Sequence, residues 1–161
     1  MKRTLVRVFA PLAILTAAAL LPAACVTSGG ALSPAERTGV EDLVHRFTQA
    51  MSRKDLDGAM SCFWNSPDLI VVVFGNAQRG YEAVRGGIAA MFEQNETVKL
   101  TVNEIAYVPV GNMVMAVGTA TYDLKPKGGP AMQLVERWTD LEQKIDGRWV
   151  YVLDHATMVP K

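Results

Sequence analysis

The sequence predicts an α+β fold in which helices come first and a curved antiparallel sheet then wraps around them. Between residues 33 and 93, apolar residues recur every three or four positions on both sides of one β-branched run. After Asn95, apolar and alternating segments are separated by turn sequences, which is typical of consecutive strands. Since helices segregated from an antiparallel sheet must cover one of its faces, we expect a single domain with one core.

Composition and charge narrow the classes of function. The 161 residues include 16 Lys and Arg against 16 Asp and Glu, so the formal net charge is zero. A neutral chain has no overall field that attracts nucleic acid, and we expect no nucleic-acid partner. The sequence has neither a glycine-rich phosphate loop nor a Cys/His/Asp cluster with ligand spacing. It therefore predicts no metal and no cofactor.

The N-terminal segment has the pattern of an export signal. Lys2, Arg3 and Arg7 precede an uncharged apolar run at residues 8–24, which ends in small residues. A membrane-spanning helix is the alternative, but the run is slightly short for one and contains two prolines. We expect an exported protein that is periplasmic or secreted. Its parts are a removable signal peptide at 1–24, a linker at 25–32 and a folded domain at 33–161.

Cys25 is a candidate for lipid attachment. The segment from Leu20 to Cys25 resembles the signal box of lipoproteins, in which a thioether-linked lipid on the cysteine anchors the mature protein. That pattern prefers leucine three positions before the cysteine, where this chain has Pro22. A lipid on Cys25, as the only contact with a membrane, and plain secretion both stay open. With only Cys62 besides it, a disulfide framework is excluded, and we expect Cys62 in the core.

Capping signals predict three helices before the sheet. Ser33, followed by proline and three residues later by glutamate, starts a helix that runs to about Lys54. Asp55 can cap a short second helix that ends near Phe63. The third helix is expected at Tyr81–Glu93, where two adjacent glycines weaken it and suggest tight packing.

Pattern and turn signals predict five strands. The β-branched run Leu69–Phe74 is apolar on both faces, so it should lie inside the sheet. In the next strand the alternation shifts phase before Ile105, and the strand should end at Pro109 or follow a sheet edge there. Asp146-Gly147 is a strong hairpin signal. The last three strands are expected at Met113–Leu124, Ala131–Ile145 and Arg148–Val159.

Several short motifs occur in a characteristic order. They are Asp55 ahead of Phe63, Gly80 before the third helix, Arg137-Trp138-Thr139, Asp146-Gly147-Arg148-Trp149 and Asp154-His155-Ala156-Thr157. With these motifs, the chain from Glu36 to Pro160 resembles the SnoaL-like branch of the nuclear transport factor 2-like superfamily. The resemblance implies a cone-shaped half-barrel, a pocket between the concave sheet and the helices, and a homodimer formed through the outer sheet face. The fold carries enzymes and binding domains alike, so the pocket must indicate the function.

Two aspartates are the first candidates for chemistry. By resemblance to the association domain of calcium/calmodulin-dependent kinase, Asp140 and Asp154 match pocket-facing positions on the last two strands. Carboxyls that meet there would have their pKa values pushed apart, so that one could act as acid and the other as base. In the alternative, both are ordinary aspartates that water solvates or that Arg137, Lys144 or Arg148 neutralises.

Alternation along the last strand assigns the remaining candidates to faces. It places Trp149, Tyr151 and His155 on one face and Asp154 on the other. His155 is a candidate acid or base, or a hydrogen-bonded structural residue. The residues expected to contact a ligand are Trp64, Tyr122, Trp138 and Val152. The alternative for the aromatic ones is that they belong to the core.

A comparison with the ketosteroid isomerases of this superfamily excludes isomerisation by their proton-shuttle mechanism. Their proton-shuttling aspartate follows a motif that Ser66-Pro67-Asp68 resembles, and the corresponding position here is Val73. A valine cannot move a proton. The sequence therefore predicts an exported domain that binds a small, largely apolar ligand in a conical pocket. The alternatives are a cofactor-independent isomerase, lyase or cyclase, and a structural dimerisation or assembly module.

Overall fold

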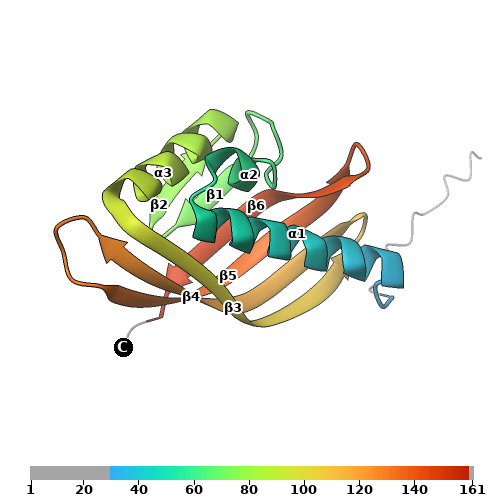
Figure 1. Cartoon of the computed structure of the whole chain (residues 1–161). Coiled ribbons are helices and arrows are strands. Elements are labelled where there is room, and N and C mark those ends of the chain that lie inside the picture. The colour runs from blue at the N-terminus through green and yellow to red at the C-terminus, as the bar shows by residue number, and fades with distance from the viewer. Residues whose placement is uncertain (1–29, 160–161) are drawn as a thin grey trace, which may run out of the picture.

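The computed structural model describes residues 30–159, in which three helices pack on the concave side of one open, six-stranded sheet (Figure 1). The α+β half-barrel expected from the sequence is therefore confirmed. The expected signal peptide, the lipidation site Cys25 and most of the linker lie outside the described residues and stay predictions. Within the described range, no helix is both long and apolar enough to cross a bilayer.

The helix boundaries follow the capping signals in the sequence. Ser33 and Glu36 form a complete capping box at the start of α1. The same helix ends at Lys54, which adopts a left-handed conformation with φ 55°. Asp55 caps α2, although that helix is shorter than predicted. The helices are α1 (Pro34–Arg53), α2 (Leu56–Met60) and α3 (Tyr81–Gln94).

The strand order across the sheet is β2-β1-β6-β5-β4-β3. Neighbouring strands pair antiparallel except β1 and β6, which are parallel. Asp146 and Gly147 form the predicted hairpin turn between β5 and β6, with φ values of 49° and 80°. The strands are β1 (Ile70–Val73), β2 (Asn76–Arg79), β3 (Asn95–Val110), β4 (Met113–Pro126), β5 (Met132–Ile145) and β6 (Arg148–Met158).

Strand β3 agrees with two details of the prediction. Its register against β4 shifts between Val102 and Glu104, which is the expected change of phase. Pro109 lies inside β3, and β3 is the outermost strand at this end of the sheet. A proline is tolerated there because an edge strand has one side free of ladder hydrogen bonds.

Strand β2 was not predicted. The chain turns back after β1 at Phe74 and Gly75, which both have positive φ, and Asn76–Arg79 then pairs with β1 along the sheet edge. This polar segment has neither the alternation nor the β-branched residues that indicate strands. Its pairing places Asn76 and Gln78 beside the helices.

A β-bulge in β6 overturns the predicted assignment of faces. Leu153 and Tyr151 pair with consecutive residues of β5, which leaves Val152 as the extra residue. One extra residue reverses the alternation on either side of it. Trp149 and Tyr151 therefore lie on the helix side of the sheet together with Asp154, and the prediction that separated them is wrong.

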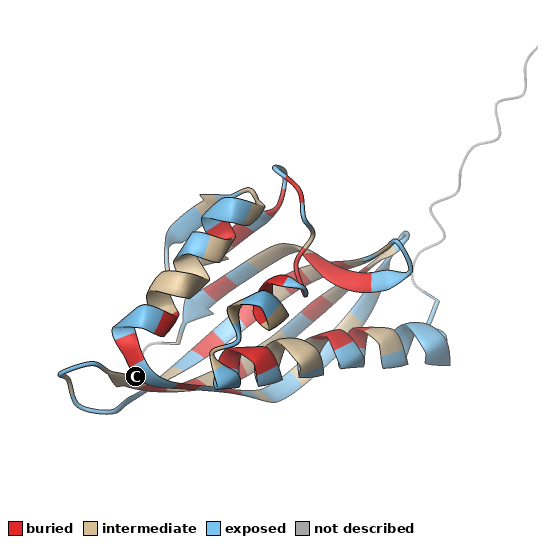
Figure 2. Cartoon of the chain, turned by 45° about the horizontal axis from the view of Figure 1, so that its top comes forward, coloured by how far each residue is buried: buried red, intermediate tan, exposed pale blue. Residues whose placement is uncertain are grey.

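The core fills the space between the helices and the inner face of the sheet (Figure 2). Val40 and Leu43 are completely buried on the side of α1 that faces the strands, and Met51 continues the same stripe. Cys62 is also completely buried, and this burial raises the pKa of its thiol. The outer face of the sheet is more open and carries exposed apolar side chains such as Val117 and Val135.

Candidate functional site

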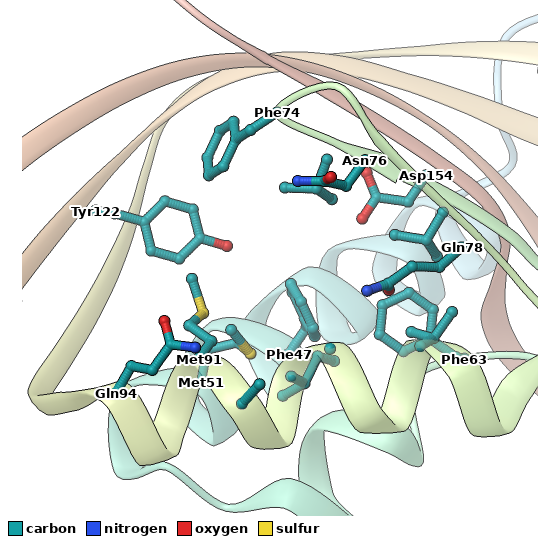
Figure 3. A pocket seen from close by; sticks show the side chains of 16 residues that line it. Phe47, Met51, Phe63, Phe74, Asn76, Gln78, Met91, Gln94, Tyr122 and Asp154 are labelled. Carbon is teal, nitrogen blue, oxygen red and sulfur yellow. The ribbon is translucent and has the colours of Figure 1, made fainter.

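A cavity of about 330 Å³ lies between α1, α3 and the strands on the β1–β2 side of the sheet (Figure 3). Most of its wall is apolar: Phe47, Met51, Phe63, Val71, Val73, Phe74, Val84, Ile88, Ala90 and Met91. The amides of Asn76, Gln78 and Gln94 add polar groups. Tyr122 and Asp154 direct a hydroxyl and a carboxyl into the space (Figure 3).

A smaller inner recess of about 40 Å³ adjoins this cavity, and Phe47, Val73, Tyr122 and Asp154 line both spaces. The rest of the recess wall comes from α1 and from β3 to β6: Val44, Thr48, Leu100, Val102, Ala120, Glu136, Trp138, Asp140, Tyr151 and Ala156. The two spaces together have an apolar outer part and an acidic, aromatic inner end.

Asp140 and Asp154 meet at this inner end. They are direct partners in the β5–β6 register, and their carboxyls share a hydrogen bond. Burial, the charge of Asp154 and this hydrogen bond hold the pKa of Asp140 well above its usual range. Burial also raises the pKa of Asp154, to about 6, although the hydrogen bond with Asp140 opposes the shift. Near neutral pH the pair as a whole therefore shares one proton and carries one negative charge.

Glu136 adds a third carboxyl to the recess. Glu136 and Asp140 are only 6% and 7% exposed. Among the described residues, neither Oε2 of Glu136 nor Oδ1 of Asp140 has a hydrogen-bond partner. Burial, together with the charge of Asp154, raises the pKa of Glu136 to about 8. Buried polar atoms are usually paired, so unpaired ones in a cavity wall point to a bound molecule or ordered water.

Among residues 30–159, no cation forms an ion pair with these carboxyls. Arg137, Lys144 and Arg148 are exposed, and the ion pairs among residues 30–159 include neither Asp140 nor Asp154. The described residues that line the two spaces contain no Lys, Arg or His. The alternative of ordinary paired aspartates therefore does not describe this structure.

The other predicted site residues divide into two groups. Tyr122 and Trp138 line the inner recess. Trp64 and Val152 are half-buried and line neither space, and Val152 is the bulge residue of β6. His155 is exposed and lines a shallow groove on the outer face of the sheet, so it does not enter the cavity with the aspartates.

Some lining residues were not singled out from the sequence. Glu136 lies on the same face of β5 as Trp138 and Asp140, so alternation along that strand was a signal for it. Asn76 and Gln78 gave no signal, because their strand was not predicted. Phe47 of α1 and Phe63 after α2 were not singled out as site residues either.

A further carboxyl, Glu142, is buried outside these two spaces. It is 0% exposed, and neither of its carboxyl oxygens has a hydrogen-bond partner among the described residues. Burial raises the pKa of Glu142 to about 8. Burial first, and then the nearby charge of Glu142, also raises the pKa of Tyr107. Glu142 is thus an uncompensated polar group within the core.

Comparison with known proteins identifies relatives of this fold. A family model described as SnoaL-like domain matches residues 44–152. A nuclear transport factor 2-like superfamily protein from Salmonella enterica aligns with TM-score 0.72 and 15% identity, over 78% of this chain and 92% of that one. A nuclear transport factor 2-like protein of unknown function from Shewanella oneidensis aligns with TM-score 0.59 and 27% identity, over 75% and 98%.

A third structure carries a suggested activity. It is a proposed dehydratase of the same superfamily from Streptomyces avermitilis, with TM-score 0.66 and 18% identity, over 77% of this chain and 96% of that one. At this identity the likeness shows the fold alone. No curated protein matches the sequence.

Proposed function

Because the chain belongs to the SnoaL-like domain family, we propose that it is an exported protein whose cavity binds a small, largely apolar molecule. One observation carries the proposal, the cavity of about 330 Å³ with a mostly apolar wall and a few polar groups. Small-molecule sites typically occupy about 300–1,000 Å³, with apolar side chains for affinity and sparse polar groups that fix orientation.

The side chains of the wall suit a ring-containing ligand. Phe47 and Phe63 pack edge to face with centroids 5.5 Å apart, and Tyr151 stands 5.5 Å from both. Met51 and Met91 complete the wall with flexible thioethers, which adapt to irregular shapes. An aromatic or alicyclic body would find aromatic edges on one side and a deformable surface on the other.

Native mass spectrometry of the protein purified from its own source tests this function. We expect one small molecule retained per chain. The variant Ala90→Phe fills the cavity and should lose this mass, whereas Ala106→Phe adds the same ring on the exposed outer face and should keep it. Equal retention by both variants would place the molecule elsewhere and contradict the proposal.

Export is a separate part of the proposal and rests on residues 1–24 and Cys25. We expect the mature protein to begin at or after Cys25. Intact-mass measurement distinguishes the two forms, because a diacylglycerol on Cys25 adds mass and makes the protein partition into detergent. A full-length mass with Met1 in place would contradict export with cleavage.

Self-association through the outer sheet face is the third part. Exposed Val117 and Val135 lie on this face. Exposed apolar side chains in such an arrangement mark contact surfaces. Sedimentation should show a dimer for the native protein and a monomer for Val117→Lys. A native protein that is monomeric at every concentration would contradict this part alone.

A cofactor-independent lyase, isomerase or cyclase is the second candidate function. The observation that favours it is the Asp140–Asp154 pair, in which one carboxyl holds a proton and the other is charged. Such a pair can supply an acid and a base to one substrate. Once the ligand is known, turnover that Asp140→Asn abolishes while binding persists would support catalysis. Unchanged turnover in Asp140→Asn would exclude this pair as the acid and base.

A further inference from the structure

We propose that the ligand is an amphiphilic amine, with its apolar ring system in the cavity and a protonated primary amino group in the inner recess. This inference rests on the ligand-binding function proposed above and names the chemical class of the ligand. It begins from the acidic lining of the recess. Among the described residues, the two spaces are lined by three carboxyls, Glu136, Asp140 and Asp154, and by no cation.

The unpaired oxygens show where the amino group belongs. Oε2 of Glu136 and Oδ1 of Asp140 are buried without a partner among residues 30–159, and both side chains line the recess. Leaving such atoms unpaired in a buried wall is unfavourable, and more so where the group is charged. A primary ammonium group has three N–H donors and no acceptor, so it can satisfy both atoms and Asp154 together.

The aromatic side chains of the recess favour the same group. Phe47, Tyr122, Trp138 and Tyr151 all line it. The faces of aromatic rings attract ammonium groups, and this attraction is strongest where water is excluded. The recess offers about 40 Å³, and a single water needs roughly 10–15 Å³ of such space. A primary amino group therefore fits, whereas a second ring does not.

Two other classes of ligand fit these walls less well. Within the described part of the chain, no three His, Cys, Asp or Glu side chains are grouped so that they could hold a metal ion. A neutral ligand with a carbonyl or hydroxyl group could accept a hydrogen bond from protonated Glu136 but would leave the Asp154 charge without a counter-ion. The pKa of about 6 for Asp154 supports a charged recess near neutral pH.

Matched pairs of probes test the inference on the unaltered protein. Phenethylamine and naphthylethylamine are each compared with the corresponding alcohol by isothermal titration calorimetry at neutral pH. The two members of a pair share the ring system and differ in the charge of the terminal group. We expect each amine to bind roughly tenfold to hundredfold more tightly than its alcohol, in line with hydrogen bonds to charged groups.

Variants place this difference in the recess. Asp154→Asn removes the charge and keeps the shape, and it should reduce the preference for the amine to about threefold or less while alcohol binding persists. Glu104→Gln makes the same change of charge on the exposed outer face and should retain the full preference. Thermal melting confirms that both variants fold.

The outcomes distinguish failure of the amine proposal from failure of the ligand-binding function. Equal or tighter binding of the alcohols would overturn the amine proposal and leave the apolar ligand site standing. Binding of the amines that survives unchanged in Asp154→Asn would also overturn it. If no member of either pair binds, the ligand-binding function itself is contradicted, together with the class of ligand.

Discussion

Ionisation of the buried Glu142 should destabilise the folded protein, and a substitution that cannot ionise should remove this effect. Its side chain is completely buried, and its carboxyl oxygens have no hydrogen-bond partner among the described residues. Burial raises its pKa from the model-compound value of 4.5 to about 8. We predict that Glu142→Gln, which keeps the shape but cannot ionise, increases the free energy of unfolding at neutral pH.

The sign and size of this effect follow from proton linkage. Below about pH 4.5 the carboxyl of Glu142 is protonated in both the folded and the unfolded chain, so its ionisation adds nothing. Between about pH 4.5 and 8 only the unfolded chain releases the proton, so stability falls as pH rises. At about 1.4 kcal/mol per pKa unit, the penalty is roughly 3 kcal/mol near pH 7. Glu142→Gln should remove that penalty.

Urea unfolding at a series of pH values measures this prediction directly. The gain in Glu142→Gln over the native protein should be small at about pH 4.5, grow steadily, and level off above about pH 8. Glu104→Gln on the outer face should give two nearly parallel curves, since water solvates that carboxylate in both states. A gain that is independent of pH would refute the reasoning, because it would mean that the Glu142 carboxylate is solvated or paired in the fold.

Four further substitutions test how single residues contribute to stability and to ligand binding. Gly86→Ala adds a methyl group in open space on α3 and should increase the free energy of unfolding in urea by about 0.5–1 kcal/mol. Gly87→Ala instead places a methyl group against the Gln78 side chain and should weaken ligand binding in titrations. Ser33→Ala removes the α1 cap and should lower the free energy of unfolding by about 1 kcal/mol. Gly118→Ala places a methyl group against the β3 backbone and should lower the free energy of unfolding in urea by about 1–3 kcal/mol. These assignments would be contradicted by a loss of stability in Gly86→Ala, by unchanged ligand binding in Gly87→Ala, or by no loss of stability in Ser33→Ala or Gly118→Ala.

Much of the fold could be predicted because its signals are local. The capping box at Ser33, the hairpin turn at Asp146-Gly147 and the alternation in β5 each depend on residues a few positions apart. Strand β2 could not be predicted, because its polar residues become a strand only through pairing with β1. A local pattern describes what a segment prefers, and tertiary pairing can override that preference.

The candidate site was predictable only in part. That Asp140 and Asp154 both point into the pocket was predicted by resemblance. The β5–β6 register then places them directly opposite each other. Val152 was expected beside the ligand, but the bulge removes it from the wall and brings Tyr151 in. A bulge changes the face of every residue beyond it, and the sequence of β6 carried no sign of it.

By itself, the sequence determined the helix caps, the hairpin, the order of elements apart from β2, and the family, since these depend on short-range chemistry and on motif order. Only the tertiary structure decided that three carboxyls share one recess without a cation. The sequence has equal numbers of acidic and basic residues, and their balance does not reveal where they gather. The pKa shift of a buried group depends on its burial and on neighbours from distant strands, so it arises only once the chain has folded.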